Sequence, residues 1–149
     1  MNNELQTVFE KIQIILNDTN HDKVTETVLQ RLVSFGYTPT EDDAFSIAFG
    51  IQKVEHHILN MTNQNTIPEG LFEVMVDMVC GEVLNGLYGS GKLNIDGLDF
   101  DSIVKSMTEG DSSITFETNT TREDRFTQLV TQLMNGKGCD LLCFRKMRW

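Results

Sequence analysis

The stretch that decides the fold reads Leu71-Phe-Glu-Val-Met-Val-Asp-Met-Val-Cys-Gly-Glu-Val-Leu-Asn-Gly-Leu87. Apolar side chains surround almost the whole of the helix that it predicts. Pro68 marks the first turn of that helix, where a missing N–H does no harm. A narrow polar strip remains, formed by Glu73, Asp77, Glu82 and Asn85. Such a helix is either central to its domain or covered by another subunit, and the sequence leaves both open.

Four further helices are predicted from apolar residues that recur every three or four positions. They span residues 5–16, 22–35, 40–58 and 121–134. Gly36 stands where a left-handed residue would end the second of them. Thr40 opens the third, with Asp43 three residues on as an acidic form of the capping box.

The third of these helices carries a second apolar stripe, Phe45 and Phe49, beside its main buried face. Two apolar faces on one helix predict packing on two sides. A chain of this size has few other elements with which to cover both faces. We therefore expect a contact between subunits at Phe45 and Phe49, together with Met75 on the fourth helix.

The pattern changes in the last third of the chain. A glycine-rich loop is predicted over residues 88–97 and a short helix over 100–107. Ser113 to Phe116 alternates polar and apolar residues and predicts a short strand. Cys139 to Trp149 is expected to be extended and strand-like.

The expected fold class is therefore mainly α. It is a helical bundle of four to five helices with a minor β element and an extended C-terminal tail. Residues 1–109 would form the helical body, and residues 110–149 the strand, the last helix and the tail, within a single domain overall.

The charge of the chain is strongly negative and unevenly spread. A formal net charge of −10 argues against binding duplex DNA through its phosphates, since that requires a basic surface. It is compatible with DNA that passes close by without sticking, and also with solubility alone. The last five residues hold three of the twelve Lys and Arg and no acid, against 22 acids in the rest of the chain. This basic tail suits an acidic partner, including the body of another copy.

The cysteines and the apolar runs bear on the compartment. Cys80, Cys139 and Cys143 cannot all pair within one chain. No signal peptide opens the sequence, and no apolar run approaches the length that spans a membrane. We expect synthesis in a reducing, intracellular environment and no membrane partner.

The segment from Gly86 to Lys92 matches the front of a phosphate-binding loop. Such a loop requires a strand before it and a Ser or Thr after the lysine, to hold magnesium. Here a helix is predicted before the loop, and Leu93 follows the lysine. A flexible loop is the better interpretation, and nucleotide binding is only a third hypothesis.

The remaining candidates for chemistry are isolated. His56 and His57 are adjacent, so on a helix they point about 100° apart and do not share a metal easily. Glu73 and Asp77 lie one turn apart, but paired carboxylates need a cleft to act on a substrate. We therefore expect no metal, no cofactor and no enzymatic activity.

The chain ends at Phe144-Arg145-Lys146-Met147-Arg148-Trp149, with its only tryptophan in last place. A terminus frays unless something holds it. Trp and Arg are enriched among the residues that anchor interfaces. The segment is either a docking element for another protein or a strand that folds back on the core of its own chain, and the sequence leaves both open.

The order of these parts is that of a known family. The relevant segments are the helix start Ile67-Pro68-Glu69, the run Met75 to Leu84, the segment Glu109-Gly-Asp-Ser-Ser-Ile-Thr-Phe116 and the ending Phe144 to Trp149. In this order, from about Val24 onward, the chain resembles the head–tail connector (adaptor) proteins of tailed bacteriophages and prophages.

The resemblance implies a structural protein of the virion neck, made in the host cytoplasm. About a dozen copies would form a homo-oligomeric ring under the portal, extend the DNA channel and support the stopper or tail-completion protein. The tail, Phe144 to Trp149, would bind the portal. Asp96, Asp99 and Asp101 would line the channel, although an outward-facing loop fits them equally. The alternative is a cytoplasmic helical interaction module with a regulatory role.

Overall fold

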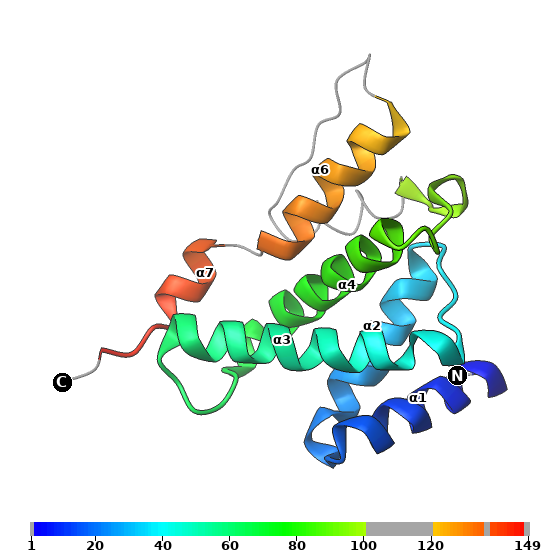
Figure 1. Ribbon diagram of the computed structural model, residues 1–149. Helices are drawn as coiled ribbons and strands as arrows, with labels where there is room; N and C mark the ends of the chain where they lie inside the picture. The colour runs from blue at the N-terminus through cyan, green and yellow to red at the C-terminus, as the bar shows by residue number, and fades with distance from the viewer. Residues whose placement is uncertain (1, 101–120, 136–137, 148–149) are drawn as a thin grey trace.

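The computed structural model describes residues 2–100, 121–135 and 138–147. These form a bundle of α-helices (Figure 1). The helices are α1 (Asn3–Leu16), α2 (Asp22–Ser34), α3 (Ala44–Thr62), α4 (Phe72–Gly89), α6 (Arg122–Asn135) and α7 (Gly138–Cys143). Short 3-10 turns lie at Thr19–His21, Glu41–Asp43, Glu69–Leu71 and Ile95–Gly97. The predicted mainly α fold is confirmed.

The ends of the helices follow from local side-chain chemistry. Asn2 caps α1 by accepting a hydrogen bond from the N–H of Leu5 at 2.9 Å. Gly36 adopts the predicted left-handed conformation after α2, with φ at 94°. The capping box between Thr40 and Asp43 is also present, in the 3-10 turn that leads into α3.

Helix α4 is the central element of the subunit. It packs against α2, α3 and α6, while α1 lies against α2 and the N-terminal half of α3 (Figure 1). Nine of its residues are buried: Met75, Val76, Met78, Val79, Cys80, Gly81, Val83, Leu84 and Leu87. Of the two possibilities that the sequence left open for this helix, the central position is the one observed.

Two glycines permit the close approach of helices to α4. A β-carbon at Gly81 would stand 2.8 Å from Cβ of Leu133 and 3.0 Å from the backbone nitrogen of Met134, both in α6. A β-carbon at Gly50 in α3 would stand 3.4 Å from Cγ2 of Val83. The contact of α4 with α6 is therefore the tighter of the two and depends on the absence of a side chain.

Two polar contacts tie the bundle together. The guanidinium of Arg31 in α2 donates to Oδ1 of Asp77 in α4, at 2.8 Å from Nη2 and 3.1 Å from Nε. Asp43 is buried, and its Oδ2 accepts from the hydroxyl of Tyr37 at 2.6 Å and from the N–H of Thr40 at 2.9 Å. A buried carboxylate is tolerated because it is hydrogen-bonded.

The structure corrects two of the predictions made from the sequence, and two others fall outside the residues that it describes. Helix α4 continues to Gly89, so the predicted loop over 88–97 begins two residues later, at Ser90. The described residues contain no strand, and the strand predicted over Ser113 to Phe116 lies outside them, as does nearly all of the helix predicted over 100–107. Cys139 to Cys143 is helical rather than extended. Leu141 is buried where α7 meets α3 while Leu142 is exposed, and a helical turn allows this one-sided burial.

Candidate interaction surfaces

The segment after α7 is held on the C-terminal end of α3. The backbone N–H of Lys146 donates to the carbonyl of Thr62 at 2.7 Å. Two side chains just beyond α3 donate hydrogen bonds to the tail. The amide of Asn63 donates to the carbonyl of Lys146 at 3.1 Å, and that of Gln64 to the carbonyl of Phe144 at 2.5 Å. The last carbonyls of a helix lack partners within it. The tail therefore serves as a cap for α3.

The ring of Phe144 lies against Gly70, in the turn that leads into α4. A β-carbon at Gly70 would stand 2.6 Å from Cζ of Phe144. Phe144 keeps 37% of its surface exposed, so the ring covers the glycine without entering the core. The tail thus joins the two ends of the connection between α3 and α4.

Most side chains of the tail face solvent. Arg145, Lys146 and Met147 are exposed, Met147 by 73%. Of the two possibilities for this segment, the backbone as far as Lys146 follows the second, contact with its own chain, without forming a strand. Its charged and apolar side chains stay accessible to another molecule. Arg148 and Trp149, the last two predicted portal-binding residues, lie outside the described part of the chain.

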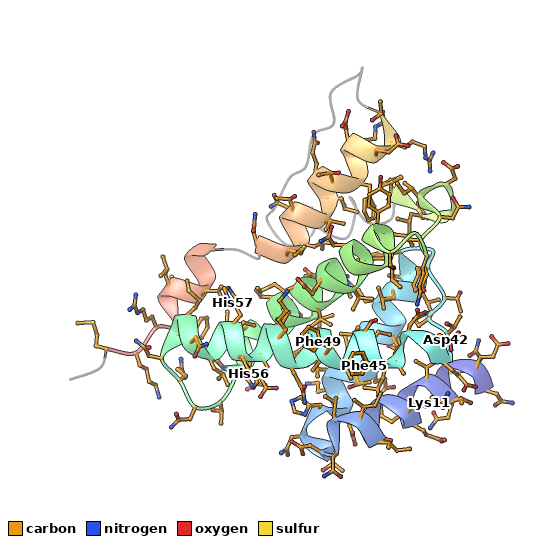
Figure 2. The ribbon with its side chains drawn as sticks, in the orientation of Figure 1. Lys11, Asp42, Phe45, Phe49, His56 and His57 are labelled. Carbon is orange, nitrogen blue, oxygen red and sulfur yellow. The ribbon has the colours of Figure 1, made fainter. Side chains whose placement is uncertain are left out.

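The two predicted interface aromatics form an exposed pair on α3. Phe45 is 67% exposed and Phe49 56%, and their rings stack with centroids 6.3 Å apart (Figure 2). The opposite face of the same helix, with Ile47, Ala48 and Ile51, is fully buried. Met75 differs from the pair. It is only 3% exposed and packs within its own subunit, so its assignment to an intersubunit surface is wrong.

Two of the three predicted channel-lining residues, Asp96 and Asp99, lie in or just after the turn Ile95–Gly97. Asp96 is exposed, and its Oδ1 is 3.2 Å from Nε of Arg122, which also lies over the ring of Phe100. Asp99 is exposed, and its backbone N–H donates to the carbonyl of Phe35 at 2.9 Å. Asp101 lies outside the described residues. The structure thus fixes the turn against α2 and α6.

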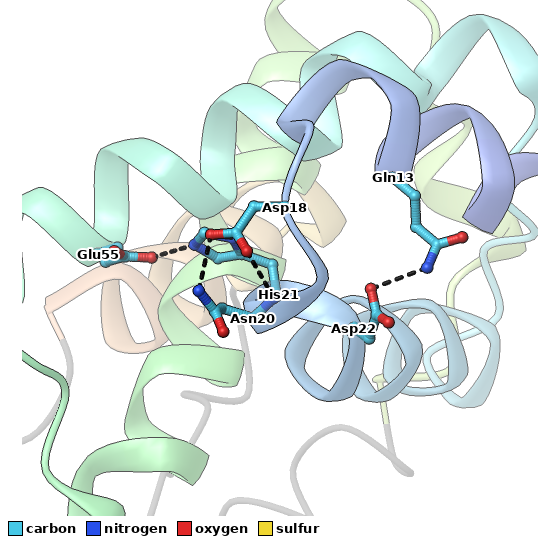
Figure 3. Close-up of polar contacts among 6 residues, drawn as sticks. All are labelled: Gln13, Asp18, Asn20, His21, Asp22 and Glu55. Atoms are coloured by element: carbon cyan, nitrogen blue, oxygen red, sulfur yellow. Dashed lines mark hydrogen bonds and ion pairs between the residues drawn. The ribbon is translucent and has the colours of Figure 1, made fainter.

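A polar cluster that the sequence did not reveal joins the corner between α1 and α2 to α3 (Figure 3). Nε2 of His21 contacts the carboxylate of Glu55, and its Nδ1 lies 3.5 Å from Oδ2 of Asp18, a distance for an ion pair rather than a hydrogen bond. The backbone N–H of Asn20 donates to Asp18 at 2.8 Å and holds the pKa of this carboxyl below its usual value. In the sequence, only the segment Asp18-Thr-Asn, which is typical of a helix cap, indicated part of this cluster.

An open pocket of about 550 Å³ lies beside this cluster, between α2 and the segment that leads into α4. Lys23 lies over the ring of Phe72, 4.6 Å from its centroid, at one wall. His21 and Glu55 form part of another. Since both acids (Asp18, Glu55 and Glu69) and a cation (Lys23) line it, the pocket does not select a ligand of one charge.

Three groups of residues that the sequence offered as candidates for catalysis or ligand binding have structural roles instead. Asp77 pairs with Arg31, at 2.8 Å between Nη2 and Oδ1, so its carboxylate already has a cation as partner. Cys80 is fully buried, and burial raises the pKa of its thiol, so it is not poised as a nucleophile. Gly86 and Gly89 belong to α4, which removes the strand and turn that a phosphate-binding loop requires.

The described residues hold no group of three or more His, Cys, Asp or Glu side chains that could bind a metal ion. None of the helices that the structure describes combines the length and apolar character needed to cross a membrane.

Comparison of the chain with protein-family models, with curated proteins and with solved structures gave no match.

Proposed function

We propose that this chain is a structural head–tail connector (adaptor) of a tailed phage or prophage virion. Its copies form a ring under the portal, which extends the DNA channel and provides the platform on which the stopper or tail assembles. In this role the protein is made in the host cytoplasm, ends in the virion neck, and acts without catalysis or a cofactor.

The observation that supports this role best is the way in which the tail is held. Its backbone is bound to Thr62, Asn63 and Gln64, whereas the side chains of Arg145, Lys146 and Met147 remain exposed. A segment anchored in this way has already lost much of its chain entropy, so a partner that binds it loses less free energy on ordering it. This is the arrangement expected of a docking element that meets the portal.

The aromatic pair on α3 supplies a contact between neighbouring subunits. Phe45 and Phe49 are the kind of large apolar side chains that dominate interface energetics once buried. Their helix is fixed from behind by α4, so the pair is presented on a rigid element. The Asn94 to Asp101 loop, with Asp96 and Asp99, is the proposed channel lining, where negative charge keeps passing DNA mobile.

The direct test is attachment of the protein to heads that carry a portal but lack the adaptor. Arg145→Glu changes an exposed cation of the tail without removing any of its backbone contacts. Heads mixed with the wild-type protein should show a ring under the portal by electron microscopy. The variant should reduce the occupied fraction about ten-fold, the loss typical of a well-buried interfacial arginine.

The matched control is Lys92→Glu, which makes the same change of charge at an exposed lysine in the loop after α4. It should attach as the wild type does. Equal loss in both variants would mean that net charge, not the tail, governs attachment. Failure of the wild-type protein to bind such heads would overturn the adaptor role and favour the alternative, a cytoplasmic helical module with a regulatory partner.

A further inference from the structure

One exposed face of α3 carries its groups in a defined order. Asp42 lies in the turn before the helix, the stacked pair Phe45 and Phe49 follows, and His56 comes two turns later (Figure 2). All four side chains are exposed. Neither the side chain of Asp42 nor that of His56 has a hydrogen bond or ion pair with another described residue. The face therefore presents an acid, two aromatics and a base, all of them available.

This order is self-complementary when two copies of the helix run antiparallel. Asp42, in the 3-10 turn that leads into α3, precedes Phe49 by seven residues, and His56 follows it by seven, which is two turns of the α-helix. A two-fold axis through Phe49 therefore sets Asp42 of one copy opposite His56 of the other, and the same pair recurs at the far end. The spacing of three and four residues keeps all these groups on one side of the helix.

We propose that free copies of this chain pair about a two-fold axis, α3 against α3, with Phe49 on the axis, Phe45 one turn away on each side, and an Asp42–His56 contact at each end. A two-fold contact uses the same patch on both subunits, so the patch must be complementary to itself. An aromatic centre with a polar rim is the usual anatomy of such a patch. Charge complementarity thus identifies the partner as a second copy.

The charged neighbours of the face agree with this pairing. Lys53, which faces Phe45 of the other copy in this register, forms an ion pair with Glu82 of α4, at 2.5 Å. Lys11 of α1 contacts Glu41. These neighbours already pair within the subunit, so Asp42 and His56 are the acid and the imidazole that the face leaves for the partner. One helical face is a small interface, which places the pair among transient contacts.

The pairing does not depend on the adaptor role, but it bears on it. The ring contact proposed above uses the same aromatic pair. One surface cannot serve both partners at once, so the two-fold pair would hold free subunits out of the ring. Its failure would leave attachment to the portal untouched, and the two proposals can therefore be tested apart.

The test is sedimentation equilibrium of the full chain from about 10 to about 500 µM, the range of a transient contact. The wild type should follow a monomer–dimer equilibrium. Asp42→Lys and His56→Glu should each weaken dimerisation about five-fold, since every reversal acts at both ends of the interface. The double variant, with the charges exchanged, should return to within about two-fold of the wild type.

Phe49→Ala removes the side chain on the axis and should weaken the dimer at least about ten-fold. Glu123→Lys, on the exposed surface of α6, makes the same change of charge as Asp42→Lys and should leave dimerisation unchanged. A wild type that stays monomeric over the whole range overturns the proposal. So does a double variant as weak as either single one, because the two positions then do not meet.

Discussion

The ring of Phe144 rests on Gly70 so closely that even one methyl group at Gly70 would collide with it, at 2.6 Å from Cζ. Phe144 belongs to the tail, and Gly70 to the turn before the central helix. The contact fixes the tail beside the backbone hydrogen bonds that it makes with the end of α3. The position of the proposed docking segment thus depends on a glycine far away in the sequence.

Gly70→Ala should release the tail without unfolding the bundle. The colliding atoms lie at the far end of a flexible, partly exposed side chain, so Phe144 can move away while the backbone of the turn stays in place. Limited digestion with trypsin, followed by mass spectrometry, should show faster cleavage after Arg145 and Lys146. In Gly89→Ala, where the new β-carbon meets nothing within 4 Å, cleavage should be unchanged.

Gly81→Ala should destabilise the bundle itself by about 1–3 kcal/mol, since the added methyl group must push α6 away from α4. It would meet Cβ of Leu133 and the backbone of Met134, neither of which can rotate aside. The control lies in the same helix. Gly86→Ala has nothing within 4 Å of its β-carbon and should stabilise α4 by up to about 1 kcal/mol through helix propensity. Urea unfolding measures the free energy of unfolding of both variants. An equal change in the two would contradict the tight contact between α4 and α6 at Gly81.

Phe49→Asp should weaken assembly more than it weakens the isolated subunit. The ring is 56% exposed, so its loss should change the free energy of unfolding by only about 0.5 kcal/mol, while a charge in a buried interface is costly. Thermal unfolding and ring formation on portal-bearing heads give the two readouts. Ile14→Asp, at a 78% exposed position on α1, is the matched control and should affect neither. Parallel losses of folding and assembly would make Phe49 a simple core residue.

We expect the free energy of unfolding to fall at alkaline pH because of Tyr37. Its burial, its hydrogen bond to Asp43 and the charge of that carboxylate raise the pKa of the phenol above the ordinary value. The unfolded chain releases this proton near pH 10 while the folded chain retains it, so the contribution is present below about pH 10 and is lost at higher pH. Between pH 9 and pH 11 the wild type should therefore lose more stability in urea than Tyr37→Phe does. Identical losses would show that Tyr37 titrates alike in both states.

The sequence by itself determined the helices and most of their ends. Gly36 and the pair Thr40 and Asp43 were predicted correctly as caps, because a cap depends on residues only a few positions apart. The exposed pair of Phe45 and Phe49 was also visible as a second stripe on one helix. The helical turn at Cys139 to Cys143 was missed, since its local pattern is too short to overrule an extended interpretation.

The position of the central helix and that of the tail depend on contacts between segments that are distant in the chain, so only the tertiary structure decided them. The sequence could not say whether the apolar helix around Met75 was central or covered by another subunit, and packing against α2, α3 and α6 made it central. Nor could it place the tail. The N–H of Lys146 finds the carbonyl of Thr62 only because α3 ends there with an unpaired acceptor, and no local pattern records such a meeting.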